Sequence, residues 1–211
     1  MEHKKTLVAT ILMSILIIAL IVVSYFYNDF NKTQMALLTD EANKILQADL
    51  SKYNIDFDTK TDKNYAKVEK AIKDYTSKLK NIYVEMQELA SGINPNTIFA
   101  VKNIPDKKLE GIDTIIDEYK EKSQNLIAEY ENLITDESIQ EYINNSEIST
   151  RQKYYRNLYN EIMLSDIMKN QYENLDEKIK NEKARLYDKL NKIEKMKTFL
   201  EENEDSWIIN G

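Results

Sequence analysis

An uninterrupted apolar run near the N-terminus divides the chain into two unequal parts. No charged residue lies between Lys5 and Asp29, and the run from Leu7 to Tyr27 is apolar apart from Thr10, Ser14 and Ser24. A helix rises about 1.5 Å per residue, so this run can cross the ~30 Å hydrocarbon core of a bilayer. The pattern therefore predicts a single transmembrane helix over residues 7–27.

Two interpretations of this run are open, a retained anchor and a cleaved secretory signal. A signal has a shorter apolar region of about 7–15 residues, followed by small residues at the cleavage site. Here the run ends in Tyr25, Phe26 and Tyr27, which are typical of the aromatic belt at a membrane interface. The chain has no cysteine, which excludes lipoprotein-type processing. We favour a retained signal anchor.

The charges that flank the run indicate its orientation. Lys4 and Lys5 precede it, whereas Asp29 and Lys32 follow it. Cytoplasmic flanks carry an excess of lysine and arginine, so we expect residues 1–6 to form a short cytoplasmic tail. Residues 28–211 would then be an extracytoplasmic domain of the cell membrane protein. The bias is two lysines against one, and the reverse arrangement stays open.

The next part of the chain has a helical pattern of apolar residues. No Gly or Pro interrupts residues 31–52, so we expect a helix there that continues from the span. After the polar stretch 53–62, Thr61 or Asp62 can cap a helix that ends at Gly92, a residue suited to the left-handed position after a helix. Heptad-like steps of three and four separate its apolar residues, which are Tyr65, Val68, Ile72, Tyr75, Leu79, Ile82, Met86 and Leu89.

A second pattern of the same kind precedes a long final helix. Its members are Leu109, Ile112, Ile116, Tyr119, Ser123, Leu126, Tyr130 and Leu133. A short amphipathic segment at 135–145 follows, and then a helix of about residues 151–203, with Ser149 or Thr150 as its cap. At about 1.5 Å per residue this last helix would be near 80 Å long, so it must overhang, bend or be broken.

These patterns predict an all-α fold class. We expect an N-terminal transmembrane helix followed by an antiparallel helical bundle, with three or four long helices and coiled-coil-like seams. The composition agrees, because 31% of residues are charged and the chain has only three Gly and two Pro. Only Arg151, Arg156 and Arg185 are arginines among 29 basic residues, and this preference for lysine is typical of AT-rich coding in a low-GC bacterium.

The charge distribution limits the possible partners. A net charge of −7 argues against nucleic acid, which is bound by clustered cations. Residues 178–197 hold eight Lys or Arg beside Glu182, Asp188 and Glu194. This segment is either a solvated helix face with ion pairs or a surface for an anionic polymer or lipid, and we favour the solvated face.

The residues that catalysis would need are absent from the sequence. His3 is the only histidine and precedes the span, and the chain has no cysteine, Gly-rich phosphate loop or G-x-S-x-G turn. No segment has the spacing of a calcium loop. Pairs four residues apart, which are Glu69 with Lys73, Asp74 with Lys78 and Glu118 with Lys122, are typical of helix-surface ion pairs. We expect no enzyme activity, no cofactor and no metal.

Two functional classes remain. The first is a membrane-anchored scaffold or interaction protein of a bacterial cell envelope, which presents its helices to a protein partner. The second is an extracytoplasmic ligand-binding or sensing bundle that acts through a partner protein, and in outline it resembles the four-helix extracytoplasmic domains of bacterial chemoreceptors. The tyrosine stripe of Tyr65, Tyr75, Tyr119 and Tyr130 could line a ligand groove or form the core, and we favour the core.

The candidate contact residues follow from the expected direction of the helices. If short connections make neighbours antiparallel, the helix of residues 65–89 and the final helix both run toward the bilayer. The connection after Gly92 and the C-terminal tail would then meet near the membrane. Their apolar residues either cap the bundle or contact a partner or the membrane interface. These residues are Ile98, Phe99, Val101, Ile104, Trp207, Ile208 and Ile209.

Overall fold

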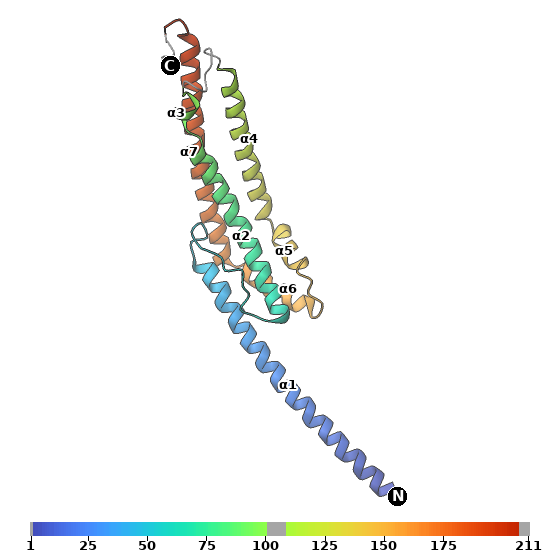
Figure 1. Ribbon diagram of the computed structural model, residues 1–211. Helices are drawn as coiled ribbons and strands as arrows, with labels where there is room; N and C mark the ends of the chain where they lie inside the picture. The colour runs from blue at the N-terminus through green and yellow to red at the C-terminus, as the bar shows by residue number, and fades with distance from the viewer. Residues whose placement is uncertain (1, 101–108, 207–211) are drawn as a thin grey trace.

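A long N-terminal helix leads into an elongated helical bundle (Figure 1). The computed structural model describes residues 2–100 and 109–206, and these residues form seven helices and no strand. The expected all-α class is confirmed. The helices are α1 Glu2–Gln47, α2 Lys63–Gly92, α3 Pro95–Ile98, α4 Glu110–Leu133, α5 Asp136–Asn144, α6 Gln152–Met163 and α7 Asp166–Glu202.

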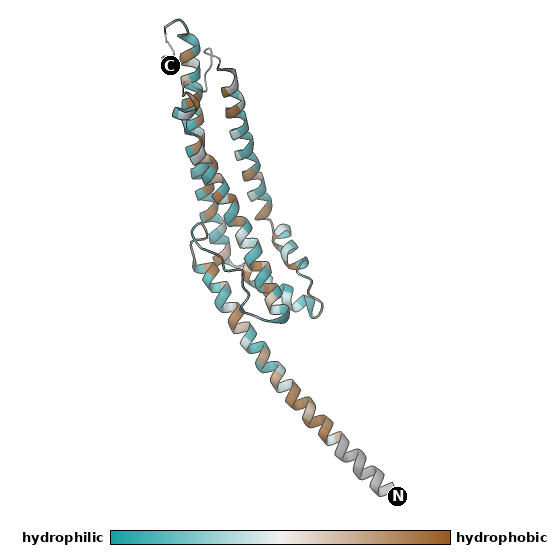
Figure 2. Ribbon diagram, in the orientation of Figure 1, coloured by the Kyte–Doolittle hydropathy of each residue, from teal (hydrophilic) through white to brown (hydrophobic). Residues whose placement is uncertain are grey.

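Helix α1 has an apolar, exposed part and a part that belongs to the bundle (Figure 2). Every large apolar side chain from Met13 to Tyr27 is exposed, and among the described residues this is the one helix long and apolar enough to cross a membrane. Farther along the same helix, Leu38 and Ile45 are buried in the core. The expected continuity of the span with the next segment is confirmed.

The chain returns toward the start of the bundle after α1, so that α2 runs parallel to α1. The amide of Asp62 donates to Gln34 Oε1 at 2.6 Å, Tyr65 lies beside Asn31, and farther along Lys73 faces Glu41. The expectation that residues 65–89 run back toward the membrane is therefore wrong. The connection 48–62 explains the difference. An extended residue spans about 3.3 Å, whereas a helical residue rises about 1.5 Å, so this connection is long enough to run back along the bundle part of α1 before α2 begins.

Helices α4 and α7 complete the bundle in opposite directions. Helix α4 is antiparallel to α2. The Tyr75 hydroxyl of α2 donates to the carbonyl of Leu133, the last residue of α4, whereas Gly92 at the end of α2 lies opposite Tyr119, which comes earlier in α4. Helix α7 runs parallel to α2, since the rings of Tyr172 and Tyr75 lie 6.1 Å apart, and farther along both helices Lys189 donates to the Ala90 carbonyl. We call the bundle end next to the apolar part of α1 the proximal end, and the end that holds α3 and the last turns of α7 the distal end (Figure 1).

The long final helix of the sequence is broken in two. Helix α6 ends at Met163, and α7 begins after Ser165, whose hydroxyl accepts from the Met168 amide at 3.2 Å. Two other expectations at helix ends are wrong. Arg151, with φ of 51°, precedes α6 in place of Ser149 or Thr150. Helix α2 ends at Gly92 as expected, but Gly92 has no positive φ, and Ile93 after it has extended backbone, so the expected left-handed position is wrong.

The predicted apolar residues of α2 and α4 form the core. They are buried, except for Leu89, Tyr119 and Leu126, which are half-buried. Tyr65, Tyr75 and Tyr130 of the predicted stripe are buried in this core. Three core tyrosine hydroxyls donate to main-chain carbonyls of other elements: Tyr75 to Leu133 at 3.0 Å, Tyr159 to Ile139 at 2.9 Å and Tyr172 to Met163 at 3.2 Å. Leu133 and Met163 end α4 and α6, so these tyrosines satisfy carbonyls that a helix end leaves unpaired.

Candidate functional site

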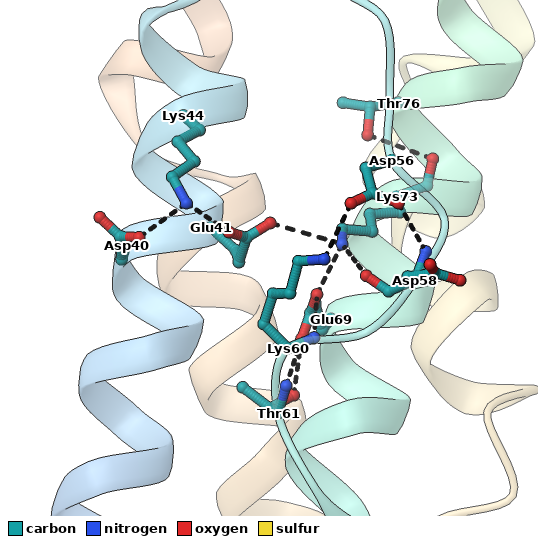
Figure 3. A network of polar contacts seen from close by, with 10 residues as sticks. All are labelled: Asp40, Glu41, Lys44, Asp56, Asp58, Lys60, Thr61, Glu69, Lys73 and Thr76. Carbon is teal, nitrogen blue, oxygen red and sulfur yellow. Dashed lines mark hydrogen bonds and ion pairs between the residues drawn. The ribbon is translucent and has the colours of Figure 1, made fainter.

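A buried charged cluster fastens the 48–62 connection to α1 and α2 (Figure 3). Its centre is Lys73, whose side chain is only 2% exposed. The Lys73 ammonium donates to Glu69 at 2.6 Å and to the Asp58 carbonyl at 2.8 Å, and Glu41 lies 3.4 Å away. A buried lysine is stable only when its charge is paired, and here two carboxylates and a carbonyl surround it.

The carboxylate of Glu69 binds the connection from the other side. It accepts from the amides of Lys60 and Thr61 at 3.0 and 2.9 Å and from the Thr61 hydroxyl at 2.7 Å. Burial raises the pKa of Glu69, but the bonds from Lys73, Lys60 and Thr61 outweigh burial, and the pKa lies below its ordinary value. Because the loop and Lys73 occupy both carboxylate oxygens, we assign this cluster a structural role.

The sequence-based interpretation of Glu69 and Lys73 as a surface pair is wrong. Both side chains are buried, whereas Glu118 and Lys122 form the expected exposed pair. Asp74 pairs with Lys70 in place of Lys78, and Lys78 pairs with Glu129 of α4.

One feature of the sequence could have indicated the buried cluster. Gln34 and Glu41 are seven residues apart, as are the core residues Leu38 and Ile45, so one face of α1 carries both the polar and the apolar contacts.

The predicted contact residues are placed only in part. Ile98 and Phe99 lie at the distal end, half-buried against the same apolar cluster as Leu200 of α7. The structure therefore places the start of the connection beside the end of α7, at the end of the bundle opposite the apolar part of α1 (Figure 1). The expected position near the membrane is wrong. The remaining predicted residues, Val101, Ile104, Trp207, Ile208 and Ile209, lie outside the described residues.

An apolar groove lies beside Ile98. It has a volume of about 440 Å³ between the α2–α3 corner and α4, and its wall includes Ile93, Ile98, Ile112 and Ile115. Glu118 and Tyr119 add polar groups at one side. A groove with apolar walls and a few polar groups is suited to an apolar side chain of a partner.

A second groove, at the proximal end, has mixed charge. It has a volume of about 670 Å³ between α2 and α5 and is lined by Lys67, Lys70 and Asp74 on one side and by Glu141 and Tyr142 on the other. Both signs of charge lie within one cavity, so a small zwitterionic solute is the ligand class that matches it. Among the described residues, no group of three or more acidic or histidine side chains is placed to hold a metal ion.

The basic segment of residues 178–197 has local acidic partners. Lys180 pairs with Asp176 and Lys192 with Asp188, each at 2.6 Å, and Lys197 pairs with Asp113 of α4 at 2.9 Å. For Lys180 and Lys192, which are exposed, the interpretation as a solvated helix face with ion pairs is confirmed, whereas the Lys197 side chain is mostly buried. No protein-family model, curated protein or solved structure matches this chain in the comparisons made.

Proposed function

We propose that this protein is a membrane-anchored, extracytoplasmic helical scaffold or interaction protein of a bacterial cell envelope, without catalytic activity. The observation that carries the proposal is the continuity of α1. One helix without Gly or Pro includes both the exposed apolar part and the buried residues Leu38 and Ile45. Sharp kinks need such breaking residues, so the anchor and the bundle are joined without a hinge.

A rigid bundle on an anchor holds its distal end at a fixed distance from the membrane. Helix α2 alone has 30 residues, which corresponds to about 45 Å at about 1.5 Å per residue. The apolar groove beside Ile98 lies at that distal end. We propose this groove as the contact for a protein partner, and Ile98 and Phe99 as residues that shape it while they cap the core.

Photo-crosslinking in cells tests the partner contact. A crosslinking residue at Asn96, exposed beside the groove, should give a discrete protein adduct, and one at Lys169, exposed at the start of α7, should not. The variant I115D places a charge in the groove wall and should remove the Asn96 adduct without unfolding the chain, because Ile115 is only half-buried. An adduct that persists in I115D would reject the groove as the contact.

Protease protection tests the anchor and the proposed orientation. Protease added to intact cells should digest residues 28–211 and spare the N-terminus, and the full chain should stay in the membrane after carbonate extraction. Protection of the bundle until the membrane is permeabilised would reverse the orientation. Release of a shortened soluble form would replace the retained anchor with a cleaved signal.

The mixed-charge groove between α2 and α5 favours a second candidate, a sensing bundle that acts through a partner protein. A ligand that binds only the folded state adds RT ln(1 + [L]/Kd) to its stability. A zwitterionic amino acid should then raise the melting temperature of the full chain in detergent, and the variant K70Q should reduce that rise. A melting temperature unchanged across amino acids would leave the scaffold as the better proposal.

A further inference from the structure

Three cations of the α6 segment lie at the proximal end without an acidic partner. Arg151, Lys153 and Arg156 are exposed, and among the described residues none of them forms an ion pair. The contrast with α7 is clear, because lysines 180, 192 and 197 there are each paired with a carboxylate. An exposed charge without a counter-ion remains available for an anionic ligand.

The position of Arg151 relative to α1 places this charge at the membrane surface. Its guanidinium donates to the Tyr27 hydroxyl at 2.7 Å and lies 5.4 Å from the centre of the Tyr27 ring. Tyr27 is the last residue of the expected span and belongs to the Tyr25–Tyr27 aromatic group. Aromatic residues of this kind lie at the level of the lipid headgroups, so Arg151 is held at that level too.

A crevice of about 590 Å³ lies between Arg151 and α1. The α1 residues that line it are ordered from apolar to polar along the helix, from Ile21 through Ser24 and Tyr25 to Asn28 and Asn31. From Ile21 to Asn31 the helix rises about 15 Å at about 1.5 Å per residue, which is enough to reach from within the hydrocarbon of one leaflet into its headgroup layer. No carboxylate is among these lining residues.

We propose that this crevice binds an anionic phospholipid of the leaflet from which α1 emerges. The acyl chain lies along Ile21, and the phosphate lies between Arg151 and the Asn28 amide. Arginine suits this role because its planar guanidinium can donate two parallel bonds to a phosphate. Lys153 and Arg156 attract further anionic headgroups to α6. The lipid fastens the base of the bundle to the bilayer.

The crevice favours a lipid over a soluble phosphate because one end of it is formed by the exposed apolar surface of α1. In a bilayer that surface faces acyl chains, which only a lipid supplies. This inference rests on the proposal that α1 spans a membrane. Carbonate extraction separates the two: a chain released by carbonate contradicts the anchor itself, whereas a retained chain without lipid preference contradicts only the lipid site.

Native mass spectrometry of the full chain, released from nanodiscs of 70% POPC and 30% POPG, tests the site. The wild-type chain should retain POPG in excess of its share of the disc. One cation at an anionic surface corresponds to about a fivefold change in binding, so R151N should lower the ratio of POPG to POPC adducts about fivefold. Asparagine adopts positive φ readily, so R151N keeps the backbone at this position unstrained.

Matched variants separate the charge from the fold. R185N removes the arginine of α7 that pairs with Glu182, far from the crevice, and should leave the adduct ratio unchanged. N28D adds a carboxylate at an exposed crevice residue without changing Arg151, and it should lower POPG retention even if R151N fails to fold. R151K keeps the charge and should retain more POPG than R151N.

Two results would overturn the lipid site. One is equal retention of POPC and POPG by the wild-type chain, and the other is a POPG preference that both R151N and N28D leave intact. Inorganic phosphate, added to the chain in neutral detergent without lipid, tests the other source of the same anion. Binding of that phosphate with the same dependence on Arg151 would assign the crevice to a soluble anion and overturn the lipid assignment.

Discussion

Both halves of the bundle have an apolar core, and the proximal half adds hydrogen bonds from buried tyrosine hydroxyls to it. In the proximal half, α1, α5 and α6 lie around α2. Hydrogen bonds from tyrosine hydroxyls to main-chain carbonyls link α2 to α4 through Tyr75, α6 to α5 through Tyr159, and α7 to α6 through Tyr172. In the distal half, α2, α4 and α7 pack through an aliphatic cluster that includes Leu186, Leu190 and Ile193. Hydrogen bonds are directional, whereas apolar burial is not.

This difference corresponds to the two tasks of the proposed scaffold. The proximal half must hold the bundle at one angle to α1, and the contacts of Asn31, Gln34 and Glu41 on α1 with Tyr65, Asp62 and Lys73 restrict that angle. The distal half carries the groove beside Ile98, where a partner would enter between α2 and α4. Apolar contacts are not directional, so they constrain the relative orientation of these helices less than hydrogen bonds do, which suits a surface that must adjust to a partner.

The largest expected effect comes from breaking the buried cluster of the proximal half. K73M removes the cation and leaves Glu69 and Glu41 buried with less compensation, which should lower the free energy of unfolding by about 3–5 kcal/mol. The matched control is K192M in α7, because Lys192 is exposed and pairs only with Asp188. K192M should change stability by less than about 0.5 kcal/mol. Urea unfolding of both variants measures the difference, and equal effects would contradict the structural role of Lys73.

A cavity in the distal half should have a smaller and more local effect. L190A removes a fully buried side chain of the aliphatic cluster and should cost about 2–4 kcal/mol. Hydrogen exchange should rise in the distal turns of α2, α4 and α7 and stay near wild type around Tyr75. L79A, a matched change in the proximal core, should raise exchange throughout the bundle. Uniform exchange in L190A would mean that the two halves unfold as one unit.

The sequence predicted the helices of both halves and the alternating directions of α2, α4 and α7, but not the direction of these helices relative to α1. The heptad spacing from Tyr65 to Met86 depends on neighbours within one helix, so periodicity alone located the buried face. The direction of α2 depends on pairs far apart in sequence, such as Gln34 with Asp62 and Glu41 with Lys73. No local pattern encodes such pairs, and a rule that favours antiparallel neighbours gave the wrong direction.

Of the two candidate contact sites, the sequence pointed to residues of the distal groove but not to the lipid crevice. Ile98 and Phe99 were identified because they are apolar residues in a connection, and they do lie beside the groove. Arg151 and Tyr27, which form the wall of the proposed lipid crevice, are 124 residues apart, so only the structure brings them together. The break before α7 had a local signal, since Ser165 followed by Asp166 is typical of a helix start.

Acid should weaken the proximal half first. Bonds from Lys178 and Ser51 lower the pKa of Asp49 to about 2, and the pKa of Glu69 is also lowered. A carboxyl group whose pKa is lower in the folded state stabilises the fold above its unfolded pKa, and this contribution is lost as pH falls through the folded pKa. The free energy of unfolding should therefore decrease from about pH 5 toward pH 2.

The same acid titration can be assigned to one residue. E69Q removes the titrating group, so its stability should be lower at pH 7 and should depend less on pH than that of the wild-type chain. Hydrogen exchange at pH 3 should rise in residues 53–62 before it rises in the distal turns of α7. Parallel pH profiles for E69Q and the wild-type chain would show that Glu69 does not contribute to the acid transition.

The smallest expected effect lies where the two halves meet. Ser123 of α4 follows Tyr119, which packs on the distal cluster, and precedes Leu126, which packs on the proximal one. Its side chain is fully buried, and its hydroxyl has no hydrogen-bond partner among the described residues. An unpaired buried hydroxyl costs about 1–3 kcal/mol, part of which is recovered when it is removed, so S123A should stabilise the chain by about 1 kcal/mol.

The matched control for S123A is the same substitution at a hydroxyl that is fully used. Ser165 donates to the Ile162 carbonyl at 2.7 Å and accepts from the Met168 amide, so S165A should destabilise the chain by about 1 kcal/mol. Thermal unfolding should therefore shift in opposite directions for the two variants. In S123A, continuous apolar contact along α4 should also bring the exchange rates of the two halves closer together. A loss of stability in S123A would mean that the hydroxyl is paired in solution, and the boundary between the halves would then be polar and hydrated.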